Sequence, residues 1–247
     1  MLREFLSNLA NAFRSKLGTT DTINAQDFSD KVDEVYDKGY EDYRKIVWDS
    51  LQRGGNRTLY GNLFRQGSAT TESFRPIYDI KPTDMATMFM ENNGTLDLVE
   101  ALEKSGVVID TSNCTNIGLA FYGATVTRIP TLDLSKCTLN DRAFENRATK
   151  TIIKLIFSET TKFINMFNNT PALENLTVDG IISNNGFNVS TCTKLTHDSL
   201  MSIINTLADK TTDTSGTNWV CTLGSTNLAK LSDAEKAIAT QKGWTLA

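Results

Sequence analysis

The sequence predicts an α+β protein in which a helical N-terminal arm precedes a short solenoid of parallel β-strands with helical caps. Three observations predict this architecture. Apolar residues recur with a step of 23 residues between residues 110 and 180, apolar residues at helical spacing fill the first 51 residues, and capping signals mark a helix near the C-terminus. A fixed period in the twenties indicates repeating units that each contain a strand and a turn.

The 23-residue repeat contains three apolar columns in register. They are a phenylalanine column of Phe121, Phe144 and Phe167, an aliphatic column of Leu132, Leu155 and Val178, and a third column of Pro130, Ile153 and Leu176. The third column stands two residues before the aliphatic one, and side chains two apart on a strand share a face. Each unit is too thin to bury its own apolar face, so we expect the units to stack around one core. The alternative is an antiparallel domain with coincidental spacing.

The composition argues against several classes of protein. A chain of 247 residues suffices for a sizeable core in one or two domains. Its net charge of -4, without a cluster of lysine and arginine, argues against a nucleic-acid partner. Four cysteines without a C-x-x-C motif and a single histidine give no reason to expect a metal or another cofactor. We favour buried free thiols over a disulfide framework.

The N-terminal stretch MLREFLSNLANAFRSKLG differs from an export signal because charges and amides interrupt its apolar residues. No stretch of the sequence approaches the length of a membrane span, so no membrane partner is expected. We therefore expect a protein that stays in the cell that makes it, or that leaves by lysis as part of a particle.

Residues 1–55 are assigned to an arm for attachment or oligomerisation. Residues 2–17 carry an apolar stripe at helical spacing, and this stripe either packs on the same protein or docks a partner. A second helix is expected to begin at the capping residue Asn24 and to run through Leu51. Gly39 interrupts its apolar face and is expected to kink or divide it.

Residues 56–106 are assigned to a connector and an N-terminal cap. Within them, residues 73–80 (SFRPIYDI) are expected to form a strand, which Pro76 confines to a sheet edge. Phe89 is an early copy of the phenylalanine column, although it stands 32 residues before Phe121 rather than 23.

The residues inserted at this longer step predict a short helix over 96–104, with Thr95 as its cap and Gly106 as its end. Terminal repeats need a cover, so we expect this helix to lie over the open first turn of the solenoid.

Residues 107–195 are assigned to the solenoid and residues 196–247 to a C-terminal α/β cap. The elements expected in this cap are a helix over 196–208, a strand over 219–223, and a final helix that begins at a capping box of Ser232 and Glu235.

The sequence offers no catalytic constellation. His197, Asp198 and Ser199 are neighbours on a predicted helix, and neighbours point in different directions, whereas a triad needs convergent side chains. There is no phosphate-binding glycine loop, and no pair of carboxylates has a reason to share a pocket. We predict a protein that is not an enzyme. Its only proposed site residues are the six of the phenylalanine and aliphatic columns, with a structural role.

Each repeat places an alanine or a methionine directly before its phenylalanine. The three segments are Leu119-Ala120-Phe121, Arg142-Ala143-Phe144 and Asn165-Met166-Phe167. They resemble the recurrent A-F or M-F element of the BspA-like leucine-rich repeat family, which implies a leucine-rich-repeat solenoid. Thr131 and Asp133 depart from this pattern, because a stricter unit is more apolar there.

Other segments show a second resemblance. AFRSKLGTTDTINAQDF at 12–28, GGNRT at 54–58, FRPIYDI at 74–80 and LGSTNLAKLSDAEKAIATQKGWTLA at 223–247 are similar to segments of phage and prophage structural proteins of Gram-positive bacteria. This resemblance implies a virion component associated with a tail, baseplate or fibre, and it implies no catalytic residues.

The resulting expectation is a non-enzymatic phage or prophage virion structural protein. Its arm would bind sister subunits and other virion proteins, and its solenoid would bind a glycan or protein of the host-cell surface. The alternative is a bacterial leucine-rich-repeat adhesin or protein-interaction module, although an adhesin needs an export route. A glycan hydrolase is a third class, and it requires two carboxylates that converge in a groove.

Overall fold

The computed structural model describes residues 2–20, 23, 28–52 and 57–247. The chain divides into two compact units, Met1–Gly54 and Gly55–Ala247, and each is described by itself. The protein is of the α+β class, and its main sheet is parallel.

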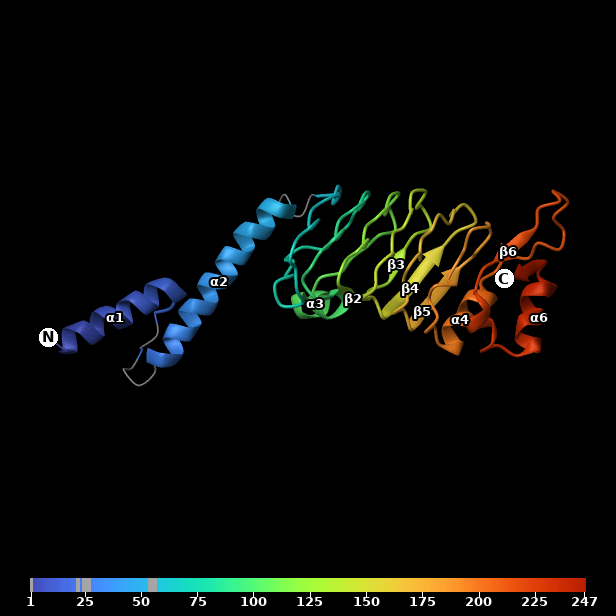
Figure 1. The fold of residues 1–247 in the computed structure, drawn as a ribbon. Helices are drawn as coiled ribbons and strands as arrows, with labels where there is room; N and C mark the ends of the chain where they lie inside the picture. The colour runs from blue at the N-terminus through green and yellow to red at the C-terminus, as the bar shows by residue number, and fades with distance from the viewer. Residues whose placement is uncertain (1, 21–22, 24–27, 53–56) are drawn as a thin grey trace. The chain divides into compact units, whose positions relative to one another are not determined.

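The N-terminal unit consists of two helices, α1 (Leu2–Leu17) and α2 (Phe28–Gln52) (Figure 1). The small core between them consists of Ala10, Phe13 and Ile23, with Leu9 and Val35 packed against it. Gly39 does not divide α2, which is a single helix of 25 residues. A lone glycine costs a helix only about 1 kcal/mol, which the turns on either side offset. The predicted cap Asn24 lies outside the described residues.

The main sheet of the second unit has five parallel strands: β1 (Leu96–Asp97), β2 (Val126–Ile129), β3 (Leu132–Asp133), β4 (Thr151–Phe157) and β5 (Asn175–Gly180). Both β2 and β3 pair with β4, and they are separated by Pro130 and Thr131. Proline has no N–H to donate to a ladder, which accounts for the interruption. The sheet is open, because its edges do not pair with each other.

The strand register agrees with the aliphatic column, since Leu132 pairs with Leu155 and Leu155 with Val178. The predicted third column is wrong at two of its three positions. Ile129 pairs with Ile152, and Ile152 pairs with Leu176, so Pro130 and Ile153 do not belong to it.

An irregularity between Ile152 and Leu155 explains this difference. One extra residue in β4 shifts the alternation of side chains, as a β-bulge does. Ile153 consequently faces outward and is 39% exposed.

A column of phenylalanine rings runs through the core. Its stacked neighbours are Phe64 and Phe89 at 5.4 Å, Phe89 and Phe121 at 5.6 Å, Phe121 and Phe144 at 5.7 Å, and Phe144 and Phe167 at 5.5 Å between ring centroids. Phe187 ends the column in an edge contact with Phe167. Figure 1 shows the successive turns of the chain lying side by side in this order.

We call residues 58–189 the turn stack. Its ladder starts well before residue 107, because the Tyr60 N–H donates to the Asp84 carbonyl at 2.7 Å and the Phe64 N–H donates to the Met88 carbonyl at 2.8 Å. Residues 58–95 are therefore part of the stack rather than a separate connector. The 23-residue step conceals them, because Phe64 and Phe89 are 25 residues apart (89 minus 64).

The predicted strand over residues 73–80 is wrong. Only an isolated bridge joins Ile80 to Ile109 there. Phe74 is buried and meets the rings of Phe64 and Phe89 edge-on, at 5.1 and 5.6 Å between centroids. The segment around Phe74 has no regular secondary structure, yet it places this ring in the core.

Helix α3 (Leu98–Ser105) begins two residues later than predicted, and its cap is Asp97 rather than Thr95. The Glu100 N–H donates to Asp97 Oδ1 at 2.9 Å, and Gly106 ends the helix with a φ of 66°. The helix packs against β1 and β2 at the side of the stack (Figure 1), so it does not cover the first turn. The reason is that earlier turns of the stack precede it.

The C-terminal part contains α4 (His197–Asn205), β6 (Trp219–Cys221), α5 (Ser225–Leu228), α6 (Asp233–Gln241) and β7 (Trp244–Leu246), and β6 pairs with β7 in parallel. The capping box of α6 is confirmed, because Ser232 and Glu235 exchange both hydrogen bonds. Trp244 is buried, and its indole N–H donates to the Ala208 carbonyl at 2.7 Å.

Helix α4 provides hydrogen-bond acceptors for backbone N–H groups of β5 on the side that does not pair with β4. Its Ser199 hydroxyl accepts a hydrogen bond from the Leu176 N–H at 2.9 Å, and its Ser202 hydroxyl accepts one from the Val178 N–H at 2.6 Å. Serine side chains thus take the place of a next strand. An exposed parallel edge would be a template for aggregation, and α4 covers it.

The residue two positions before each of the five stacked phenylalanines, Phe64 to Phe167, adopts a left-handed backbone. These residues and their φ angles are Asn62 at 62°, Thr87 at 57°, Leu119 at 56°, Arg142 at 51° and Asn165 at 50°. Asparagine tolerates this conformation, whereas a larger L-residue loses about 1–2 kcal/mol there.

We therefore expect Asn165→Leu to lower the free energy of unfolding by about 1 kcal/mol, because leucine is strained in this backbone. The reverse exchange in the same column, Leu119→Asn, is the matched control and is expected to be neutral or stabilising. Urea denaturation of both variants checks this. Equal losses of stability in the two variants would contradict the assignment of strain.

Candidate binding site

The six residues of the predicted repeat core all lie inside the turn stack. Their exposed fractions are 0% for Phe121, Phe144, Leu132 and Leu155, 1% for Phe167 and 5% for Val178. They hold the stack together and cannot touch a ligand. Groups that recognise a ligand must therefore stand at positions beside these columns.

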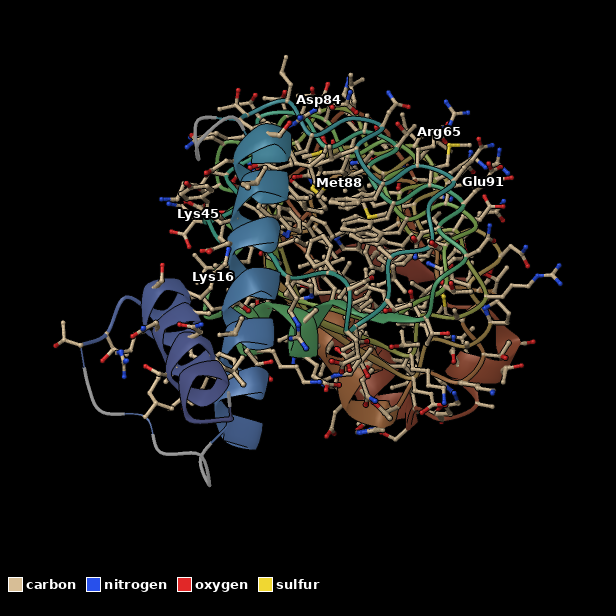
Figure 2. All side chains as sticks on the ribbon, turned by 90° about the vertical axis from the view of Figure 1, so that its left-hand side faces the viewer. Lys16, Lys45, Arg65, Asp84, Met88 and Glu91 are labelled. Carbon is tan, nitrogen blue, oxygen red and sulfur yellow. The ribbon has the colours of Figure 1, made fainter. Side chains whose placement is uncertain are left out.

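A pocket of 470 Å³ opens at the corner of the stack that follows the phenylalanine column. The residues that line it are Glu91, Tyr122, Gly123, Ala124, Thr125, Glu145, Asn146, Arg147, Ala148 and Asn169. We call it the corner pocket. Figure 2 shows Glu91 at this corner, beside Arg65 and away from Met88, which points into the core.

Backbone hydrogen bonds between turns bring the lining residues together. The Glu91 N–H donates to the Tyr122 carbonyl at 2.7 Å, and the Gly123 N–H donates to the Glu145 carbonyl at 2.8 Å. Tyr122 and Glu145 each directly follow a phenylalanine of the column, and Glu91 stands two residues after Phe89. The three residues follow the phenylalanine column on neighbouring turns and share one corner, where Glu145 is only 7% exposed.

Arg142 and Glu145 form a paired group at the rim. The Arg142 guanidinium donates from Nε to Glu145 Oε2 at 2.6 Å and from Nη2 to Glu145 Oε1 at 3.0 Å. Its Cζ lies 4.6 Å from the centroid of the Tyr122 ring, and Nη2 donates to the Tyr122 hydroxyl at 3.4 Å. Hydrogen bonding to Glu145 raises the pKa of Arg142 above its ordinary value. A bidentate pair fixes both side chains.

Amide side chains hold the carboxylates from the neighbouring turns. The Asn168 side chain donates to Glu145 Oε2 at 3.4 Å, and the Gln66 side chain donates to Glu91 Oε2 at 2.8 Å. The corner pocket therefore has a preorganised polar rim, whose residues and supporting amides come from five successive turns.

Glu91 and Glu145 line one pocket, so the prediction that no two carboxylates share a pocket is wrong. The signal was present in the sequence, because Tyr122, Glu145 and Asn168 occupy the column next to the phenylalanines. Residues that directly follow the phenylalanines occupy equivalent places on successive turns, although their exposure differs, from 7% for Glu145 to an exposed Asn168. Glu91 was harder to find, since it is separated from the regular repeat by the longer step.

The arrangement does not resemble the pair of a glycan hydrolase, in which one carboxyl donates a proton. Both oxygens of Glu145 are occupied by the guanidinium of Arg142, so this carboxylate serves as an ion-pair partner. Among the described residues, no group of three or more His, Cys, Asp or Glu side chains is placed to hold a metal ion.

The cysteines are not activated nucleophiles. All four thiols are free and buried. Burial raises the pKa of Cys137, Cys192 and Cys221 to about 12, so these thiols stay protonated near neutral pH. None of them lines the corner pocket.

His197 and Ser199 do not act together. His197 Nε2 lies 2.8 Å from Glu235 Oε1 on α6, whereas the Ser199 hydroxyl faces β5. The contact with Glu235 raises the pKa of His197 above its ordinary value of 6.5, and Asp198 adds a smaller effect in the same direction. The hydrogen bonds from Ser232, followed by the one from His197, lower the pKa of Glu235 below its ordinary value of 4.5.

This pair predicts a pH-dependent contribution to stability. A raised histidine pKa stabilises the fold below pH 6.5, and the effect is lost as pH rises through the folded-state pKa. We expect His197→Gln to lower the melting temperature more at about pH 5.5 than at about pH 8.5. Differential scanning calorimetry at both values checks this, with Asp198→Asn as a weaker variant of the same site. An equal fall in melting temperature at both pH values would contradict a charged pair of His197 and Glu235.

No helix in the described ranges is long and apolar enough to span a membrane. The structure defines an α+β protein with a parallel sheet and a surface pocket that has charged and amide side chains at its rim. Comparisons with protein-family models, curated proteins and solved structures return no match.

Proposed function

We propose that this chain is a non-enzymatic attachment protein of a phage or prophage virion. The turn stack, in this proposal, is a leucine-rich-repeat solenoid of the BspA-like kind that binds a host-cell surface receptor. The N-terminal unit attaches it to sister subunits and to other virion proteins. The observation that carries the proposal is a stack of packed turns with a polar-rimmed pocket on its surface, in a chain that also has a separate helical unit.

The stack suits recognition because its surface is ordered before any partner binds. The phenylalanine column and the parallel ladder fix each turn against the next. A partner then meets side chains that lose little freedom on binding. The shared core makes the turns depend on each other, as in repeat proteins.

The N-terminal unit supports the proposed self-association. In the described part of this unit, the core between α1 and α2 has three buried apolar residues, Ala10, Phe13 and Ile23. Ile46 on α2 is 68% exposed. A unit of about 50 residues with so small a core gains stability from oligomerisation. Several copies on one particle also raise the avidity for a surface receptor.

The test is binding of the purified full chain to a panel of Gram-positive cells, together with sedimentation of the same sample. We expect cell binding and an oligomer. Ile46→Ala should weaken the oligomer, because burying this side chain stabilises the interface. The neighbouring Lys45→Ala is the matched control and should leave the oligomer unchanged. A chain that remains monomeric and binds no cells would overturn the proposal.

The alternative of a bacterial adhesin or protein-interaction module has its own supporting observation. An apolar groove of 360 Å³ lies beside α3. Among its lining residues, Val108 is 57% exposed and Ile153 is 39% exposed. Exposed apolar surface of this kind is typical of protein contacts. Capture of a bacterial protein that Val108→Asp abolishes, with no binding to intact cells, would favour this alternative.

A further inference from the structure

We infer that the corner pocket binds a neutral sugar unit of a cell-surface polysaccharide, and this inference rests on the proposed attachment function. The pocket's volume of 470 Å³ falls within the range of about 300–1,000 Å³ that is usual for small-ligand sites.

The charges of the site cancel. Two carboxylates, Glu91 and Glu145, and the guanidinium group of Arg147 line the pocket, and a second guanidinium group, that of Arg142, binds Glu145 from outside the lining. Arg142 and Glu145 are already paired with each other. A site for a phosphate, another anion or a cation would carry an excess of the opposite charge. A balanced site favours a ligand without net charge.

Three lining side chains retain hydrogen-bonding capacity for a ligand. Within the described residues, Arg147 and the Asn169 amide make no side-chain hydrogen bond, and Glu91 receives one, from Gln66. Together they present guanidinium and amide donors beside carboxylate and amide acceptors. Sugar hydroxyls donate and accept, so neighbouring hydroxyls of one ring can use both kinds of group.

The rest of the pocket is apolar. Ala124, Ala148 and the ring of Tyr122 line it beside Gly123, whose missing side chain leaves room. A sugar ring has a face of C–H groups that packs on such a surface, and a tyrosine ring combines an apolar body with a polar end. A polar rim around an apolar floor fits a sugar better than it fits an extended peptide, which would need a row of backbone partners.

The repeat geometry also suits a polymer. Equivalent corner positions recur along the stack, as Tyr122, Glu145 and Asn168 show. A polysaccharide presents similar units along its length, so several weak contacts can add.

The experiment uses the full chain and a double variant, Glu91→Ala with Arg147→Ala. The matched control is Glu159→Ala with Lys162→Ala, which also removes one carboxylate and one cation from exposed positions. The control residues follow β4, and neither of them lines the corner pocket. Circular dichroism verifies that both double variants are folded.

Binding is measured on a panel of Gram-positive cells that are untreated, treated with protease, or treated with periodate, which cleaves vicinal diols. It is also measured on purified neutral wall polysaccharide from those cells. We expect binding to survive protease, to be lost after periodate, and to weaken about tenfold or more in the pocket variant but not in the control. If the ligand is neutral, the affinity for the polysaccharide should also change little between about 0.05 and 0.5 M salt.

The outcomes separate the two proposals. Cell binding that protease abolishes, and that periodate and the pocket variant leave unchanged, overturns the sugar inference while the attachment function stands. A steep loss of binding with salt overturns the claim of a neutral ligand. Absence of binding both to cells and to the isolated polysaccharide overturns the inference and the proposed function together.

Discussion

Truncation of Phe144 to alanine is expected to lower the free energy of unfolding by about 3–5 kcal/mol. Its ring is fully buried and stacks between Phe121 at 5.7 Å and Phe167 at 5.5 Å. The loss has two parts, the transfer of the ring from the core and the cavity that the neighbouring turns cannot fill. Because each turn packs only on its neighbours, the cavity separates the two halves of the stack.

Urea denaturation followed by circular dichroism measures this effect. Leu139→Ala is the matched control, because Leu139 is a large apolar residue of the same turn and is 57% exposed. Its removal should change the stability by about 0.5 kcal/mol or less. A small effect of Phe144→Ala, similar to that of the control, would show that the ring is not at the centre of the core.

The second large effect is expected from Gly180→Ala. Gly180 ends β5 with a φ of 76°, and a Cβ at this position would overlap the carbonyl oxygen of Phe157 on the neighbouring strand. The left-handed backbone costs an alanine about 1–2 kcal/mol, and forced overlap adds about 1–3 kcal/mol. The carbonyl belongs to the backbone of β4, so no side-chain rotation relieves the contact. We expect Gly180→Ala to lower the free energy of unfolding by about 2–5 kcal/mol in total.

Gly216→Ala separates these two causes. Gly216 has nearly the same φ, 75°, but apart from its chain neighbours no atom lies within 4 Å of the place that a Cβ would take. Gly216→Ala should therefore lower the free energy of unfolding only by the cost of the left-handed backbone, about 1–2 kcal/mol. Thermal denaturation of both variants gives the difference, which reports the close approach of β4 and β5. Equal losses in the two variants would mean that the strands are not packed as closely as the structure shows.

Several elements were predictable because their causes lie within a few neighbouring residues. The capping box of Ser232 and Glu235 is satisfied by groups three positions apart. Thr196 caps α4 in the same way. The helix over residues 2–17 follows from the spacing of its apolar residues. Such signals need no knowledge of the remaining chain.

The step of 23 residues determined which side chains are buried in the regular part of the stack. Phe121, Phe144 and Phe167 occupy equivalent places because each turn between them has the same length. The first turns have steps of 25 and 32 residues, counted between Phe64, Phe89 and Phe121. A search for one fixed step cannot find them, although the same rings continue the column.

The tertiary structure alone decided the register and the pocket. Ile152, rather than Ile153, faces Leu176, because an irregularity in β4 is settled by packing between strands and leaves no mark in the periodicity. Glu91 and Glu145 meet at one corner because ladders join three turns of different lengths. Local spacing thus determined the helices and the buried columns. Contacts between turns that are distant in sequence determined which surface residues are neighbours. The reason is that the length of each turn and the register of its hydrogen bonds set which residues lie side by side in the stack.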